Sequence, residues 1–187
     1  MNRSDKFIDI VFKAEGFYSN DIDDSGGETL YGIARNKNPK WLGWKIVDEY
    51  KTKSNFPNNM KRDGNLIALK NTFYNELYAK PCKIDEFDNE LLALHVFDFA
   101  VNAGIKTSIK TLQKIVGTFQ DGIIGNKTIK AANAKENALE LFILARKAYY
   151  IKIAVGKNAK YKNGWLNRVD NIKIGRASCR ERVSLSV

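Results

Sequence analysis

The chain has 187 residues, of which 44% are hydrophobic, and its 31 Lys and Arg against 21 Asp and Glu give a formal net charge of +10. This composition excludes a disordered chain, the two cysteines exclude a disulfide framework, and no apolar run approaches the roughly 18 residues of a membrane helix. We therefore expect one soluble domain, with or without a small appendage and with no membrane span, whose positive charge favours an anionic partner: nucleic acid, a membrane surface or an acidic wall polymer.

The first predicted helix covers residues 4–15. No apolar signal segment precedes it, so we expect synthesis in the cytoplasm without a secretory signal. Ser4 can cap this helix, and an apolar stripe at helical spacing runs from Phe7 to Val11. Residues 16–33 are rich in Asp, Gly, Ser and Asn, which predicts turns and at most a short hairpin.

Helical periodicity recurs along the rest of the chain. Segment 91–103 is apolar nearly all round, which is typical of a helix at the centre of a core. Thr107 or Ser108 is expected to cap the next helix. No period-2 run is long enough for a substantial sheet, so the fold class is mainly α with at most a small β-hairpin. Further helices are predicted at 41–51, 66–77, 109–116, from 126 onward and at 138–155.

Residues 175–187 differ in composition from the rest of the chain. They contain three Arg, three Ser and no Lys, whereas Lys strongly outnumbers Arg before them. We interpret this segment as a tail that was added for expression. Cys179 belongs to it, and Cys82 is predicted to be a buried, small apolar side chain rather than a nucleophile.

Glu15 stands out because it follows Val11 by four residues and so lies near the apolar stripe of the first helix. Removal from water disfavours the charged carboxylate and raises its pKa, as a general acid near neutral pH requires. The alternative is an ordinary glutamate at a helix end that turns to solvent or pairs with a lysine such as Lys13.

The acidic, glycine-containing segment after Glu15 allows two interpretations. A calcium loop is one, since Asp21, Asp23, Ser25 and Gly26 match positions 1, 3, 5 and 6 of the EF-hand pattern. Position 12, however, is Gly32 instead of the bidentate glutamate. The other is a polar loop folded back against Glu15, which would bring a second carboxylate, Asp24, and the hydroxyl of Thr29 to one cleft.

The stretch from Glu15 to Ile33, EGFYSNDIDDSGGETLYGI, resembles the signature of glycoside hydrolase family 108. Its members are phage-type peptidoglycan hydrolases (N-acetylmuramidases) that are also described as secretion activators. The family pattern runs Glu-Gly-Gly-Tyr, Asn-Asp-Pro, Asp-Pro-Gly-Gly, Thr and Tyr-Gly-Ile. The chain has Phe17, Ile22 and Ser25 where the family has Gly, Pro and Pro, and these departures concern the rigidity of the loop.

Downstream segments also resemble the family, and together the resemblance covers residues 4–172. DFAVNAG at 98–104 is similar to its Asp-x-Ala-Val-Asn-x-Gly helix. Its C-terminal portion, a predicted peptidoglycan-binding region, is matched at 112–113, 121–128 and 164–168. The resemblance implies a lysozyme-like catalytic region at 1–105, a helical peptidoglycan-binding region packed on it at 106–174, and the tail at 175–187.

By this resemblance the fold is lysozyme-like and the substrate is peptidoglycan, cleaved at the β-1,4 bond between N-acetylmuramic acid and N-acetylglucosamine. Glu15 matches the catalytic glutamate and would protonate the glycosidic oxygen. Asp24 would stabilise the oxocarbenium-like transition state or orient a water, and Thr29 would hold that water. Asp21 or Asp23 could take the place of Asp24. Neither a metal ion nor another cofactor is expected.

Four further residues are candidates for substrate binding. Tyr18 and Tyr31 flank the acidic loop and could stack on sugar rings, or be ordinary half-buried tyrosines. Asn102 could bind an N-acetyl group or cap Gly104. Asp98 could contribute to the same cleft, although a structural role with a backbone N–H or a lysine is favoured. The single histidine, His95, cannot form a histidine metal site alone and is expected in the core.

Two other hypotheses stay open. A non-catalytic peptidoglycan-binding module would bind the wall without releasing reducing ends. A basic nucleic-acid-binding protein is less favoured, because the chain lacks a clear recognition helix or arginine cluster, so nucleic acid is not expected as a partner. We expect a monomeric, endolysin-like protein of bacterial or prophage origin that reaches the cell wall or periplasm through a holin-type pore or at lysis. The carboxylate separation that decides between retention and inversion does not follow from the sequence.

Overall fold

The computed structural model describes residues 2–12, 17–21 and 26–172, and it is mainly helical, as predicted. The helices are α1 (Arg3–Phe12), α2 (Gly43–Lys51), α3 (Gly64–Tyr74), α4 (Glu90–Ala103), α5 (Ile105–Val116), α6 (Asn126–Ala134), α7 (Ala138–Ile153) and α8 (Lys162–Asn171). A π-helical segment, Asn75–Ala79, continues α3, and short 3-10 turns cover Asn58–Met60, Ile84–Glu86 and Gly156–Tyr161.

A small antiparallel sheet is the only sheet among the described residues. Its strands, β1 (Tyr18–Ser19), β2 (Thr29–Leu30) and β3 (Ile33–Ala34), follow one another in the order β1-β2-β3. Tyr18 pairs with Leu30, which in turn pairs with Ile33. The expected hairpin is therefore present, and a third short strand extends it.

Helix α4 occupies the centre of the core, as its composition predicts. Every residue from 92 to 100 is buried, and α1, α5 and α7 pack against the helix. Its N-terminus is capped by Asn89, whose side chain accepts a hydrogen bond from the Leu92 N–H. Cys82 is also fully buried, and burial raises the pKa of its thiol to about 12, which suits the predicted structural role.

Two predicted helix caps are wrong. Helix α1 begins one residue before Ser4, and the side chain of Asn2 accepts the Asp5 N–H at 2.8 Å in the capping position. Helix α5 begins at Ile105, directly after α4 ends. Ser108 is therefore inside α5, buried against α4, where its hydroxyl donates to the Val96 carbonyl at 2.8 Å.

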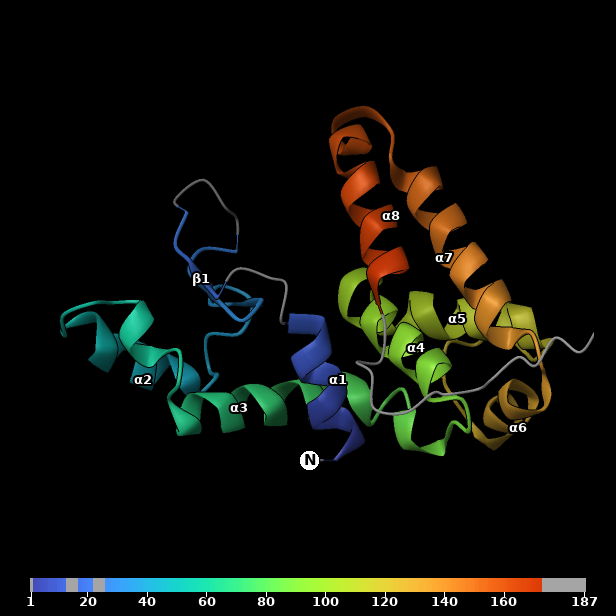
Figure 1. Cartoon of the computed structure of the whole chain (residues 1–187), viewed down its shortest axis with the longest axis horizontal. Coiled ribbons are helices and arrows are strands. Elements are labelled where there is room, and N and C mark those ends of the chain that lie inside the picture. Colours follow the sequence, from blue (N-terminus) through green and yellow to red (C-terminus); the bar gives the residue numbers. More distant parts are fainter. Residues whose placement is uncertain (1, 13–16, 22–25, 173–187) are drawn as a thin grey trace, which may run out of the picture.

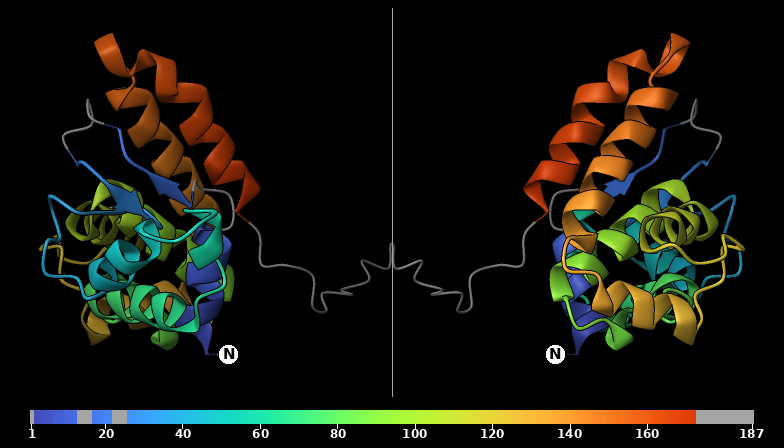
Figure 2. Two further views of the ribbon diagram at one scale, coloured as in Figure 1. Left: turned by 90° about the vertical axis from the view of Figure 1, so that its left-hand side faces the viewer. Right: turned by 90° about the vertical axis from the view of Figure 1, so that its right-hand side faces the viewer.

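Helix α8 was not predicted from the sequence. It packs antiparallel to α7, and the two helices form a hairpin that stands out from the rest of the molecule (Figure 1). The small sheet rises on the same side of the molecule as this hairpin (Figure 2). The C-terminal end of α1 points upward between the sheet and α8 in Figure 1. No helix in the described ranges is long and apolar enough to cross a membrane.

Candidate functional site

Glu15, the predicted general acid, lies outside the described residues, as do Asp23 and Asp24. The structure does describe α1, which ends three residues before Glu15. Ile10 and Val11, in the last turn of α1, line a cavity of about 220 Å³ between α1, α4 and α8. The remaining lining residues are Asp98, Gly164, Arg168, Asn171 and Ile172.

Asp98 is the polar centre of this region. Its carboxylate is fully buried and accepts hydrogen bonds from two arginines. Arg146 of α7 donates from Nη2 to Oδ2 at 2.5 Å, and Arg168 of α8 donates to Oδ1 from Nε at 2.9 Å and from Nη2 at 2.7 Å. One carboxylate thus joins three helices, and charge-assisted bonds of this kind are among the stronger ones in proteins. The predicted structural role of Asp98 fits this geometry, but its partners are arginines rather than a backbone N–H or a lysine.

His95 belongs to the same buried network. Its Nδ1 accepts a hydrogen bond from Nη1 of Arg146 at 2.9 Å, which requires the neutral imidazole. Burial, and secondarily the adjacent Arg146 charge, lower the pKa of His95 to about 4. His95 is therefore the core histidine that the sequence led us to expect.

Asn102 is exposed, one turn after Asp98 on α4. Its amide donates to the Asp98 carbonyl at 2.7 Å and to the Asp98 carboxylate at 3.2 Å. Gly104 is capped differently, because its N–H donates to the carbonyl of Ala100. Asn102 therefore braces Asp98 from the surface instead of capping the glycine. Its predicted contact with an N-acetyl group stays a prediction.

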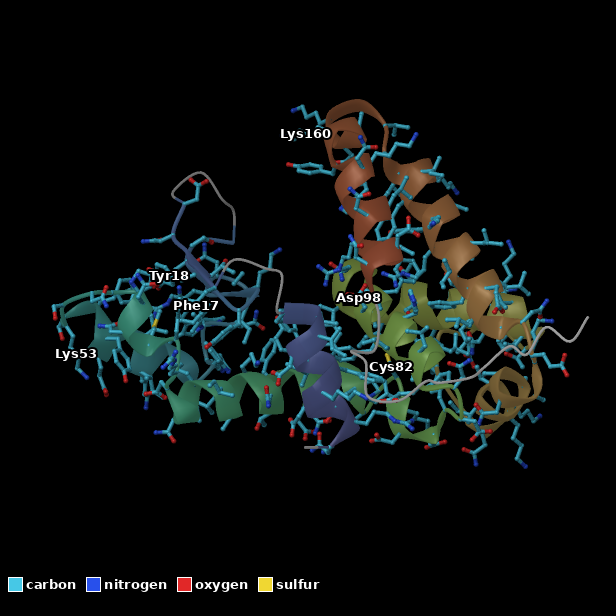
Figure 3. The ribbon with its side chains drawn as sticks, in the orientation of Figure 1. Phe17, Tyr18, Lys53, Cys82, Asp98 and Lys160 are labelled. Atoms are coloured by element: carbon cyan, nitrogen blue, oxygen red, sulfur yellow. The ribbon has the colours of Figure 1, made fainter. Side chains whose placement is uncertain are left out.

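The other side of the α1 terminus is aromatic. The ring of Phe12 lies 4.2 Å from that of Tyr74, whose hydroxyl donates to the Tyr31 carbonyl at 2.8 Å. Tyr31 in turn donates its N–H to the carbonyl of Phe17 at 2.9 Å, and the two rings meet edge to face at 4.9 Å. This chain of contacts holds the sheet against the end of α1. Phe17 and Tyr18 lie on one side of α1 and Asp98 on the other in the view of Figure 3.

Tyr18 donates from its hydroxyl to Glu28 at 2.8 Å. Glu28 is 7% exposed and also pairs with Arg35 at 2.9 Å and with Lys51 at 2.7 Å. Burial and the Glu28 carboxylate raise the pKa of Tyr18 well above its ordinary value. The ring of Tyr18 packs edge to face on Phe56 at 4.8 Å. The hydroxyl end of Tyr18 is thus committed to the protein, and stacking on a sugar stays a prediction for its half-buried ring.

Thr29 lies on β2 between two buried residues, Glu28 and Leu30, so its side chain points to the opposite face from theirs. Its hydroxyl donates to the carbonyl of Gly27 at 3.3 Å, and the side chain is half-buried. Tyr18, Thr29 and Tyr31 therefore come together on the small sheet, whereas Asp98 and Asn102 come together on α4. The catalytic and binding roles assigned to these residues stay predictions.

Sequence reasoning missed two charged groups, Arg146 and Glu28. A signal existed for Arg146, because it falls four residues after Phe142 and four before Tyr150, in the middle of the buried stripe of α7. Glu28 gave no comparable signal in a segment crowded with acidic residues. As for the calcium alternative, Asp21 is exposed, and no cluster of acidic, His and Cys residues that could hold a metal occurs within the described ranges.

Comparison with known proteins decides the family. The glycosyl hydrolase 108 model matches residues 8–104, more than half of the chain, and a predicted peptidoglycan domain matches residues 107–170. The chain belongs to the glycosyl hydrolase 108 family. Among curated proteins, no match is found. Among solved structures, SagA of Brucella abortus is similar over 89% of each chain, with 27% sequence identity and a TM-score of 0.62.

Membership in the glycosyl hydrolase 108 family, with a predicted peptidoglycan domain in the same chain, supports a peptidoglycan hydrolase in general terms. The matched hydrolase region includes the C-terminal half of α1, the small sheet and α4, while the matched peptidoglycan region includes α6, α7 and nearly all of α5 and α8. The cavity at the end of α1 is lined from both regions. The predicted division of the chain into two regions at residue 105 stays a prediction.

Proposed function

We propose that this glycosyl hydrolase 108 member is an N-acetylmuramidase that cleaves the β-1,4 bond between N-acetylmuramic acid and N-acetylglucosamine. The observation that carries the proposal is the family match across residues 8–104, which includes the motif that begins at Glu15. In our proposal Glu15 is the general acid that protonates the glycosidic oxygen as the bond breaks.

The surroundings of the α1 terminus support this assignment. Phe7 and Ile8 are fully buried, so α1 is fixed in the core, and its last turn borders a cavity. A general acid near neutral pH needs a pKa raised by partial removal from water, and this is the property that we propose for Glu15. Asp24 is proposed as the second carboxylate, with Asp21 and Asp23 as the alternatives, and Thr29 as the group that holds the water.

The buried ion pairs have a supporting role in this proposal. The carboxylate of Asp98 fixes Arg168, and through it α8, against α4 at the cavity. A wall that is held by several charge-assisted bonds keeps its position while a polymer enters and leaves. The roles of Tyr18, Tyr31 and Asn102 as sugar contacts belong to the proposal as well.

Mass spectrometry of the fragments released from purified sacculi tests the proposal. The wild-type chain and a control, Glu49→Gln on the exposed face of α2, should release fragments with reducing N-acetylmuramic acid ends. Glu15→Gln should release none while keeping the helical circular dichroism of the wild type. Reducing N-acetylglucosamine ends would mean that another bond is cut, and full lysis by Glu15→Gln would remove that residue from the mechanism.

The same experiment separates the enzyme from a non-catalytic binding module, which the match to a predicted peptidoglycan domain makes a specific alternative. A binding module would sediment with sacculi and release no reducing ends from either wild type or Glu49→Gln. A monomeric state, passage through a holin-type pore and a part in lysis or secretion stay proposals that depend on this activity.

A further inference from the structure

Charge is distributed very unevenly along the chain. Residues 107–170 contain twelve Lys and Arg against four Asp and Glu, a net charge of +8, whereas residues 8–104 contain twelve against fifteen, a net charge of −3. The part that matches the predicted peptidoglycan domain is therefore the cationic part. An anionic ligand would be attracted to this half of the molecule in particular.

The cationic half contains a groove of about 510 Å³ between α5 and α7. Its walls are apolar, and one lysine from each helix lies beside them. The groove is lined by Lys114 and Ile115 of α5 and by Leu141, Ala148, Tyr149 and Lys152 of α7, among others. Neither lysine forms an ion pair with any residue in the described ranges, so both charges are available to a ligand.

Small side chains on α7 leave the groove open, and the ring of Tyr149 forms one wall of it. Ala148 is exposed and leaves the space open. Tyr149 is held in place because its ring meets those of Phe99 and Tyr150 edge to face, at 5.2 Å and 5.6 Å. A preformed hollow with apolar walls and a few polar groups is the usual form of a ligand site.

Helix α7 also exposes large apolar side chains next to the groove. Leu144 is 62% exposed and Ile151 is 50% exposed. A helix that is apolar nearly all round is normally covered on every side, yet this side of α7 is open within the described part of the chain. The exposed apolar surface and the two lysines together define a ligand that is both anionic and partly apolar.

We infer that the groove between α5 and α7 binds the acidic, alanine-containing stem peptide of peptidoglycan. This inference rests on the proposed function. In a peptide-carrying glycan strand the lactyl carboxyl is amide-linked, so the free carboxylates lie on the peptide and not on the sugars. Those carboxylates complement Lys114 and Lys152, and the methyl groups of the alanines complement the wall formed by Ile115, Leu141 and Tyr149.

The test uses the full chain and NMR shift titrations that locate and measure binding. The probe is the N-acetylated tetrapeptide acetyl-Ala-γ-D-Glu-Lys-D-Ala, whose two carboxylates and single amine leave a net negative charge, as in the amide-linked stem peptide. The double variant Lys114→Gln/Lys152→Gln should weaken binding about tenfold or more, the loss of about 1.4 kcal/mol that two charge-assisted contacts can account for. Ala148→Arg should fill the groove and abolish binding. Lys127→Gln/Lys130→Gln on α6 removes the same charge elsewhere in this half and should leave affinity within about twofold.

Several outcomes would overturn the inference. It would be overturned if the wild type did not bind the tetrapeptide, if the shifts lay outside α5 and α7, or if the α6 control lost as much affinity. Shifts of α5 and α7 that a peptide-free disaccharide or a polyphosphate chain causes, and the tetrapeptide does not, would also overturn it. Hydrolysis of peptide-stripped glycan strands gives an independent readout. Glu15→Gln should lose this hydrolysis and keep peptide binding, whereas the groove variants should keep the hydrolysis and lose peptide binding. Failure of one proposal can therefore be told from failure of the other.

Discussion

Asp98 carries more of the stability of this molecule than any exposed acidic residue should. It is fully buried and balances Arg146, which is also fully buried, as well as Arg168. Replacement by Asn leaves two guanidinium groups without a counter-charge, and we expect the free energy of unfolding to fall by about 3–5 kcal/mol. Urea unfolding followed by circular dichroism measures the loss.

The matched control for Asp98 is Asp170→Asn. Asp170 pairs with Lys147 between the same two helices, α8 and α7, but its side chain is 56% exposed. An exposed pair contributes less than about 1 kcal/mol. Similar losses in the two variants would show that burial does not determine the strength of these pairs, and that Asp98 does not hold the three helices together.

His95 makes stability depend on pH in a narrow window. Burial beside Arg146 lowers its pKa from 6.5 to about 4, so the folded chain favours the neutral ring. The stabilisation that comes from the neutral His95 ring is complete above pH 6.5 and is lost as the pH falls toward 4. At pH 5 the free energy of unfolding is about 2 kcal/mol lower for this reason. The chain has one histidine, so the window between pH 6.5 and 5 belongs mainly to this residue.

NMR can follow the single imidazole directly, and we expect its resonances to titrate near pH 4 rather than 6.5. The variant His95→Gln should have a flatter stability profile than the wild type between pH 6.5 and 5. An imidazole that titrates near its ordinary pKa in the folded chain would be inconsistent with the burial and the arginine contact described here.

The sequence predicts the burial of single residues better than it predicts their partners. Phe7 and Val11 were expected in the core because of their apolar spacing, and Cys82 because a lone cysteine behaves as a small apolar side chain, and all three are buried. The partners of Asp98 could not be named, because Arg146 and Arg168 are 48 and 70 residues away along the chain. Pairing at that separation is decided by the packing of whole helices.

Helices α4 and α5 form a tight pair because Gly104 joins them without a loop. Its φ of +90° and ψ of 146° fall in a region that residues with a Cβ rarely adopt. A Cβ at this position would meet nothing within 4 Å, so Gly104→Ala introduces backbone strain without a clash. We expect a loss of about 1–3 kcal/mol in the free energy of unfolding, measured in urea.

Gly64 offers the control for this prediction. It is the first residue of α3, without a positive φ, and a Cβ there would also meet nothing within 4 Å. Gly64→Ala should therefore not lower the free energy of unfolding, because alanine has the higher helix propensity. If Gly104→Ala were equally neutral, the junction between α4 and α5 would have to tolerate a different backbone.

The helices differ in how clearly the sequence predicts them. Helix α4 was predictable because nearly all of its residues are apolar. Helix α8 was not, since Gly and Asn interrupt it and Trp165, Leu166 and Val169 are its only apolar residues. It is held by tertiary contacts instead: Trp165 stacks on Tyr150 at 5.4 Å and Arg168 binds Asp98. Packing of this kind stabilises helices that propensity alone would not form.

In the folded molecule, segments that are far apart in the sequence meet at the end of α1. The sheet, with Tyr18, Thr29 and Tyr31, and helix α8, with Arg168, flank the end of α1 from opposite sides (Figure 1). The sequence could place the first group near Glu15, because a short loop joins them. It gave no means of placing α8, which comes some 150 residues after Glu15, beside the same helix end.

The uneven charge of the molecule makes wall binding sensitive to salt. With Glu15→Gln to prevent hydrolysis, binding to purified sacculi should weaken steadily from 50 to 500 mM salt, because the screening length falls from about 14 Å to about 4 Å over this range. The variant Lys127→Gln/Lys130→Gln/Lys157→Gln, in the +8 half, should lose affinity at low salt. Removing three exposed lysines from the other half, with Lys37→Gln/Lys40→Gln/Lys45→Gln, should change it little. Salt-independent binding, or equal losses in the two triple variants, would mean that attraction is not directed through residues 107–170, and the peptidoglycan region would then bind by shape and apolar contact alone.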